Sequence, residues 1–162
     1  MHNHLFFVCP TDHLEPIVNL TYEGENYFIT SLGNSIAFDE KMIAKVNHLI
    51  DQKQIDKIIF VLAYSNKLVN DALSGHCRVE VLDEFCNDLV RKNERIGRLY
   101  SLDDQLLMVL NHHLMDKISE LKNGLNGTRY KLPIISATIY QWNGIFKEVN
   151  QNFSFKNCVC LN

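Results

Sequence analysis

Four short apolar runs divide the chain into segments typical of buried β-strands. They are rich in Phe, Ile and Val and contain few polar positions, which is the pattern of strands covered on both faces of a sheet. The runs are "LFFVC" (residues 5–9), "NYFITSL" (26–32), "KIIFVLAYS" (57–65) and "LPIISATIY" (132–140). A fifth segment, "IFKEV" (145–149), follows the turn signal "QWNG". We expect it to return antiparallel along the sheet edge.

Between these runs, apolar residues recur at the three- and four-residue spacing of amphipathic helices. One helix is predicted within 38–52, with Asp39 as its N-cap, and a second over 101–122, with Ser101 as its N-cap. A shorter helix is predicted over 79–92. Alternating strands and helices imply an α/β fold of three layers, with a central, mainly parallel sheet of four strands plus an antiparallel edge strand.

Composition narrows the class of protein. A chain of 162 residues has the size of one ordinary domain, so we expect residues 1–162 to form a single domain. No apolar run approaches the roughly 18 residues that cross a bilayer, and no secretory signal is visible, so a cytoplasmic protein without a membrane partner is expected. The odd count of five cysteines favours reduced thiols. A net charge of −3 argues against a nucleic-acid partner.

The candidate chemistry lies where the predicted strands end. In parallel sheets the loops after the strands converge over a crevice, which is where ligands bind. The sequence has no glycine-rich phosphate loop, G-x-S-x-G elbow, H-E-x-x-H or paired C-x-x-C. It has instead "VCPTDHLEP" (8–16), "LGN" (32–34) and "LAYSNKLV" (62–69) after the first three strands. The candidate pocket residues are Cys9, Thr11, Asp12, His13, Gly33, Asn34, Tyr64, Ser65 and Lys67.

In this order, the strand-end segments resemble those of the β-class carbonic anhydrases. In that family the first strand ends in C-x-D-x-R followed by an acidic residue and proline, the second in R-N-A-G-N, and the third in G-H-x-x-C-G. Cys9, Glu15 and Pro16 match the first pattern, and Gly33 and Asn34 match the second. "VLAYSNKLV" stands where the family has "VLGHSDCGA", and "ISATIYQWNGIF" resembles the family's "VHGWVYDIETGEL". The resemblance extends over nearly the whole chain.

The resemblance also implies a degenerate zinc site. The family's Cys, His and Cys ligands fall on Cys9, Tyr64 and Lys67, and its Asp and Arg dyad falls on Thr11 and His13. Catalytic zinc needs about three protein donors plus water, and a protonated lysine offers no lone pair. The resemblance therefore implies a homodimeric pseudoenzyme without a cofactor, acting as a binding or regulatory homologue.

Lys67 differs from the zinc ligand that the resembling family has at this position, and this difference suggests a specific hypothesis. We expect its ammonium to replace the metal by facing the Cys9 sulfur or the Asp12 carboxylate, with the Tyr64 hydroxyl satisfying a neighbouring group. The helix predicted to begin near Asn66 is expected to offer free amides to a small anion such as bicarbonate, phosphate or sulfate, assisted by Lys67.

Two enzymatic or reactive alternatives stay open. In one, a metal-dependent lyase or hydrolase uses a rearranged zinc site built from Cys9, His13 and a third residue, which the partner subunit could supply. In the other, a nearby cation makes Cys9 a reactive thiol.

Several further residues are expected to have structural roles. His112 and His113 are predicted to be surface or interface histidines, because adjacent helical residues point about 100° apart and cannot easily share one metal ion. Cys158 and Cys160 are interpreted as ordinary thiols. Trp142 is expected to be a packing or interface anchor in its turn.

Overall fold

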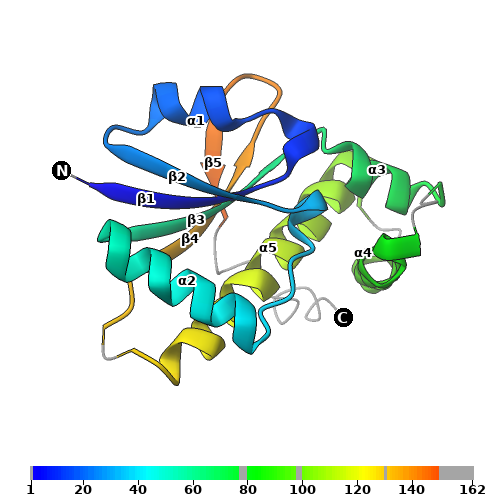
Figure 1. Cartoon of the computed structure of the whole chain (residues 1–162). Helices are drawn as coiled ribbons and strands as arrows, with labels where there is room; N and C mark the ends of the chain where they lie inside the picture. Colours follow the sequence, from blue (N-terminus) through cyan, green and yellow to red (C-terminus); the bar gives the residue numbers. More distant parts are fainter. Residues whose placement is uncertain (1, 77–79, 98–99, 130, 150–162) are drawn as a thin grey trace, which may run out of the picture.

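A five-stranded sheet forms the centre of the computed structural model, which describes residues 2–76, 80–97, 100–129 and 131–149 (Figure 1). The strand order is β2-β1-β3-β4-β5. The pairs β1–β2, β1–β3 and β3–β4 are parallel, and β4–β5 is antiparallel. This confirms the predicted fold class and its edge strand. The strands are β1 (Asn3–Val8), β2 (Glu25–Thr30), β3 (Lys57–Ala63), β4 (Ile134–Tyr140) and β5 (Phe146–Glu148).

The helices lie between the strands, as their spacing predicted, with one addition. The two predicted N-caps are confirmed: the Asp39 side chain accepts a hydrogen bond from Met42 N at 2.8 Å, and Ser101 Oγ accepts one from Asp104 N at 3.2 Å. The short helix α1 was not predicted. The α-helices are α1 (Glu15–Thr21), α2 (Glu40–Lys53), α3 (Lys67–Leu73), α4 (Asp83–Ile96) and α5 (Leu102–Asn126), with 3-10 turns η1 (Pro10–Asp12), η2 (Leu32–Asn34) and η3 (Glu80–Leu82).

The two faces of the sheet are covered to different extents. Helices α2 and α5 cover one face, where Phe7 and Phe60 stack with ring centroids 4.7 Å apart (Figure 1). On the other face, α1 covers a smaller cluster that contains Phe6 and Val18. Helices α3 and α4 lie beyond the carboxyl ends of the strands (Figure 1). The carboxyl ends of the strands are therefore covered by helices α3 and α4.

Some predictions fall outside the described residues, and one is contradicted. The Cys158 and Cys160 pair and the first residue of the predicted 79–92 helix lie outside them. Cys86 is disulfide-bonded, so the expectation of reduced thiols is wrong for this residue, whereas Cys9 is a free thiol. Within the described ranges, none of the helices has the length and apolar character needed to span a membrane.

Candidate functional site

Asn34 joins the carboxyl ends of the two central strands. Its side chain is fully buried, and its amide nitrogen lies 3.3 Å from the carbonyl oxygen of Phe7 in β1 and 3.0 Å from that of Val61 in β3. Asn34 has a φ of 54°, in the left-handed region that Asn enters more readily than most residues. These two hydrogen bonds fix η2 against the sheet and bring Gly33 next to Cys9.

Cys9 is a buried thiol held by the residues around it. Its side chain is 0% exposed, the Gly33 N–H donates to Sγ at 3.1 Å, and Thr11 Oγ1 lies 3.0 Å from Sγ. Gly33 has a φ of 59°, and a Cβ built on it would lie 2.5 Å from Cζ of Phe85. Only glycine fits this approach. The sulfur is therefore engaged by a backbone amide and a hydroxyl, and no solvent reaches it in this conformation.

Asp12 ties the turn after β1 to the end of β3. Its carboxylate accepts hydrogen bonds from the Ala63 N–H and from Nδ2 of Asn66, both at 2.8 Å. Asn66 in turn accepts from Val69 N at 3.0 Å, which caps α3. Burial raises the pKa of Asp12, and this outweighs the hydrogen bonds and the nearby His13, which lower it.

The Lys67 ammonium does not face Cys9 or Asp12, so the prediction that it replaces a metal there is wrong. Its side chain is exposed, and within the described ranges it makes no ion pair or hydrogen bond with Cys9 or Asp12. The inward position belongs to Asn66, which is 1% exposed. Because successive helical residues are rotated by about 100°, the residue after an inward-facing N-cap points away from the crevice.

Tyr64, which the resemblance matches to the zinc-binding histidine of the β-carbonic anhydrases, contacts the start of α5. Its hydroxyl lies 3.1 Å from Oδ1 of Asp103, to which it donates. Burial raises the pKa of Tyr64, and the Asp103 carboxylate raises it further. The predicted role of this hydroxyl, satisfying a neighbouring group, agrees with this contact. Ser65 follows in the turn and is exposed.

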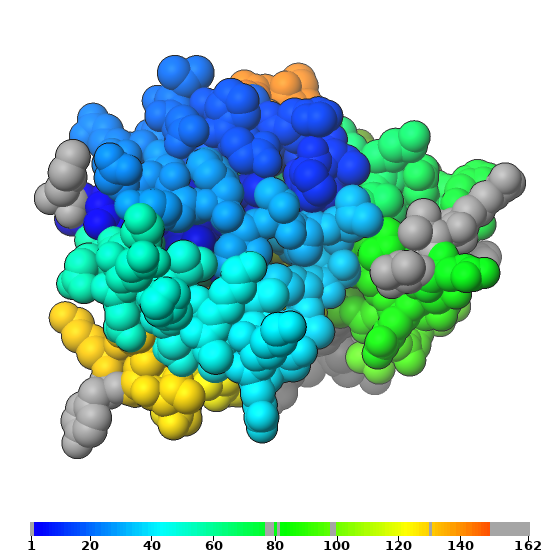
Figure 2. All heavy atoms as spheres, viewed as in Figure 1, coloured from blue at the N-terminus to red at the C-terminus, as the bar shows by residue number. Residues whose placement is uncertain are grey.

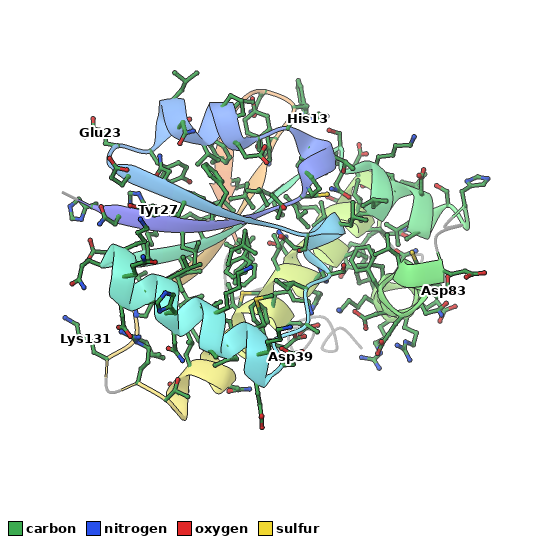
Figure 3. All side chains as sticks on the ribbon, in the orientation of Figure 1. His13, Glu23, Tyr27, Asp39, Asp83 and Lys131 are labelled. Atoms are coloured by element: carbon green, nitrogen blue, oxygen red, sulfur yellow. The ribbon has the colours of Figure 1, made fainter. Side chains whose placement is uncertain are left out.

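The donors around Cys9 do not fit zinc. His13 is exposed, with a φ of 53°, and lies at the start of α1 on the outer side of the molecule (Figure 3). Throughout the described residues, no three His, Cys, Asp or Glu side chains are grouped as metal ligands. The structure therefore does not bring Cys9 and His13 into such a group, and the rearranged site stays a prediction.

His113 is buried, so the prediction of a surface or interface position is wrong. It is 2% exposed, and its Nε2 lies 2.9 Å from the Gly33 carbonyl oxygen. Because a carbonyl oxygen only accepts, Nε2 carries the proton. Burial lowers the pKa of His113 to about 4, and Lys92 adds to this effect. The ring is therefore neutral at pH 7.

The sequence analysis did not predict that the side chains of Asn66 and His113 are buried, although each had a signal. Asn66 directly precedes a short helix, the position at which Asn is a preferred N-cap. His113 lies four residues after Val109 and three after Leu110, on the apolar face of its own helix. Asp103, the partner of Tyr64, had no signal, because its contact depends on how α5 packs.

Comparisons with known proteins agree on the fold. No protein-family model matches the sequence. No curated protein sequence matches it significantly. Three β-carbonic anhydrases with similar solved structures are CafA of Aspergillus fumigatus, a tetrameric enzyme of Sordaria macrospora, and the Coccomyxa enzyme in complex with acetazolamide.

The similarity of these structures is high, whereas the sequence identity is low. CafA has a TM-score of 0.73 and 14% identity, covering 96% of this chain and 78% of its own. The Sordaria enzyme has 0.74 and 14%, covering 92% and 81%. The Coccomyxa enzyme has 0.71 and 15%, covering 91% and 72%. The chain therefore has the fold of the β-carbonic anhydrases, as its strand-end segments predicted.

Proposed function

We propose that this protein is a carbonic-anhydrase-like homologue that has lost the catalytic zinc site and acts by binding, as a regulatory pseudoenzyme. The observation that carries the proposal is the state of the three positions that hold zinc in the resembling family. Cys9 keeps its thiol but bonds to Gly33 and Thr11, Tyr64 bonds to Asp103, and Lys67 faces solvent. One thiol without two further donors does not make a catalytic zinc site.

The chemistry of the remaining residues supports the same proposal. In the hydration of carbon dioxide, a bound metal supplies the attacking hydroxide by lowering the pKa of its water from near 16 to about 7. Asp12 cannot do this as a lone carboxylate, and its oxygens already accept from Ala63 and Asn66. The two positions that correspond to the family's dyad, Thr11 and His13, are exposed. Nothing in this set replaces the metal in activating water.

Metal content and hydration rate test this proposal. We expect protein purified without chelators to carry far less than one zinc per chain and to hydrate carbon dioxide no faster than buffer, measured by elemental analysis and stopped flow. Zinc near one per chain together with catalysed hydration would contradict it. In that case the variant His13→Ala, at an exposed position, distinguishes two kinds of zinc site. Only a rearranged site that includes His13 would lose its zinc.

Binding of a small anion is part of the proposal. The exposed Ser65 and Lys67 lie on either side of the N-cap Asn66 at the start of α3, and Lys67 has no ion pair within the described ranges. Its ammonium is therefore available to bicarbonate, phosphate or sulfate. Titration with each anion, followed by amide chemical shifts, should give saturable changes at these two residues. The proposal fails if the Lys67→Gln variant responds as strongly as the unchanged protein.

We also propose a homodimer. Large apolar side chains are exposed on α1 and on the β4–β5 turn, with Leu20 at 89%, Trp142 at 88% and Ile145 at 57%. Tyr22 and Phe146, whose ring centroids are 5.6 Å apart, show that these two regions adjoin. Exposed apolar groups that lie together are typical of interfaces. Light scattering should give twice the chain mass, and Trp142→Ser should shift it toward the monomer. A monomeric unchanged protein would disprove this part.

A further inference from the structure

Helix α4 begins without the side-chain cap that starts α2, α3 and α5. Asp39, Asn66 and Ser101 cap those three helices, whereas the residue before α4 is Leu82, whose side chain has no hydrogen-bonding group. A first turn without a cap keeps unsatisfied N–H groups and frays more easily. Figure 2 shows α4, in green, at one end of the molecule, and Asp83 marks its start there (Figure 3). The start of α4 therefore depends on packing and on covalent links.

A disulfide at Cys86 holds this first turn. Cys86 lies in the first turn of α4, is disulfide-bonded and is 5% exposed. Its partner cysteine lies outside the described residues, because Cys9, the other cysteine within them, is a free thiol. A disulfide restrains the chain at the residues that it joins, and breaking it returns that freedom.

Phe85, the neighbour of Cys86, covers one side of Gly33. A Cβ built on Gly33 would lie 2.5 Å from Cζ of Phe85, and the Phe85 ring meets the His113 ring edge-on with centroids 5.2 Å apart. The Gly33 N–H donates to the Cys9 sulfur at 3.1 Å. Gly33 therefore contacts both the Phe85 ring and the buried thiol, and the first turn of α4 helps to enclose Cys9.

The later turns of α4 have anchors of their own. The main packing partners of the helix are α3 and α5. Leu89 is fully buried and Ile96 is 6% exposed. Because proteins open locally where few apolar contacts hold them, the first turn can fray while these later residues stay packed.

From this geometry we infer that the Cys86 disulfide controls access to Cys9. In the bridged chain, Phe85 covers Gly33 and the Cys9 thiol is enclosed. A dithiol supplies two electrons and two protons: the S–S bond breaks, Cys86 and its partner become thiols, and the dithiol closes to a cyclic disulfide. The first turn of α4 then frays, Phe85 leaves Gly33, and Cys9 becomes a modification site for an electrophile. This redox control goes beyond the proposed binding function and does not depend on it.

Alkylation of Cys9 by iodoacetamide tests the inference. The reagent bonds its carbon to the sulfur, while the thiol proton passes to solvent and iodide leaves. The full chain purified in air is compared with chain reduced by dithiothreitol, which is removed under nitrogen before the reagent is added. Peptide mapping by mass spectrometry follows Cys9 alone, and we expect roughly tenfold faster alkylation after reduction. Equal rates in the two states, or absence of the Cys86 disulfide in the chain purified in air, would overturn the inference.

Two serine variants separate the disulfide from other effects of the reductant. Cys86→Ser should react at Cys9 as fast as the reduced chain without dithiothreitol, and the reductant should not change its rate. The matched control is Asn87→Ser, which places the same residue at the adjacent exposed position and keeps the disulfide. It should react slowly until it is reduced. Fast alkylation of both variants without reductant would contradict a specific role of the disulfide.

Hydrogen exchange of the unchanged chain shows whether the opening is local. The amides of residues 87–90 of α4 bond to the carbonyls of its first turn, and those of residues 44–47 have the same place in α2, which Asp39 caps. Reduction should speed exchange at 87–90 and leave 44–47 unchanged. Equal changes in both helices would indicate general unfolding, and no change at 87–90 would show that the disulfide does not hold α4. Either result would overturn the inference.

Discussion

Two clusters of polar side chains differ in how their polar groups are used: the residues around Cys9 and Asp12, and those around Lys92 between α4 and α5. Around Cys9 and Asp12, each functional atom bonds to a backbone amide or a neighbouring side chain. Around Lys92, the carboxylates of Asp88 and Asp116 share one ammonium. The Cys9 sulfur and the Asp12 carboxylate are thus satisfied within the protein, whereas beside α4 and α5 two anionic groups depend on a single cation.

The largest expected effect concerns the close contact between Gly33 and Phe85. Gly33→Ala places a Cβ 2.5 Å from Phe85 at a φ of 59°, so overpacking and backbone strain should together lower the free energy of unfolding by about 4 kcal/mol. Gly75→Ala is the matched control, because its φ of 73° is similar but no atom of the described residues lies within 4 Å of the built Cβ. It should cost about 1 kcal/mol. Urea unfolding of both variants checks this, and equal losses would show that Phe85 can move aside.

The second effect is a dependence of stability on pH that originates in His113. Its pKa is about 4 in the folded chain against 6.5 unfolded, so only the unfolded chain binds the proton between these values. Stability should therefore fall by about 3 kcal/mol as the pH drops from 6.5 to 4, and stay constant with respect to this group above 6.5.

The His113→Gln variant isolates this effect from the carboxylates that titrate in the same range. Gln can still donate to the Gly33 carbonyl but does not titrate. The difference in unfolding free energy between the two proteins should change with pH, because contributions such as that of Asp12 cancel. Parallel curves for the two proteins from pH 7 to 4 would show that His113 is not buried as a neutral ring.

The smallest effects distinguish Asn66 from Lys67. Asn66→Ala removes the α3 cap and a hydrogen bond to Asp12, and should destabilise the protein by about 2 kcal/mol. Lys67→Ala removes an exposed side chain and should change stability by less than about 0.5 kcal/mol. Thermal or urea unfolding compares the two. If Lys67→Ala lowered the stability as much as Asn66→Ala, the hypothesis that the Lys67 ammonium replaces a metal would be supported again.

The strands and the long helices could be predicted because their signals are local. The continuous apolar run of β3 and the caps Asp39 and Ser101 follow from period and hydrogen-bonding chemistry alone. Helix α1 was missed because it has seven residues and buries only Val18, too little for a periodic pattern.

The side-chain directions at the candidate site were harder to predict. Whether Asn66 or Lys67 faces the crevice depends on the residue at which α3 begins, and a shift of one position turns a side chain by about 100°. His113 shows a different failure. Its spacing from Val109 indicated burial, but a polar side chain is assigned inward only when its partner is known, and Gly33 lies 80 residues away along the chain.

Because of the two hydrogen bonds of the Asn34 side-chain amide, the hydrogen exchange of nearby backbone amides should depend on the opening of the sheet. Since Asn34 holds the ends of β1 and β3 together and Gly33 is its neighbour, the Gly33 amide hydrogen cannot meet water while those strands remain paired. It should exchange with deuterium as slowly as the amides in the middle of β1, although it belongs to a turn. A connecting segment would then be among the most protected parts of the molecule.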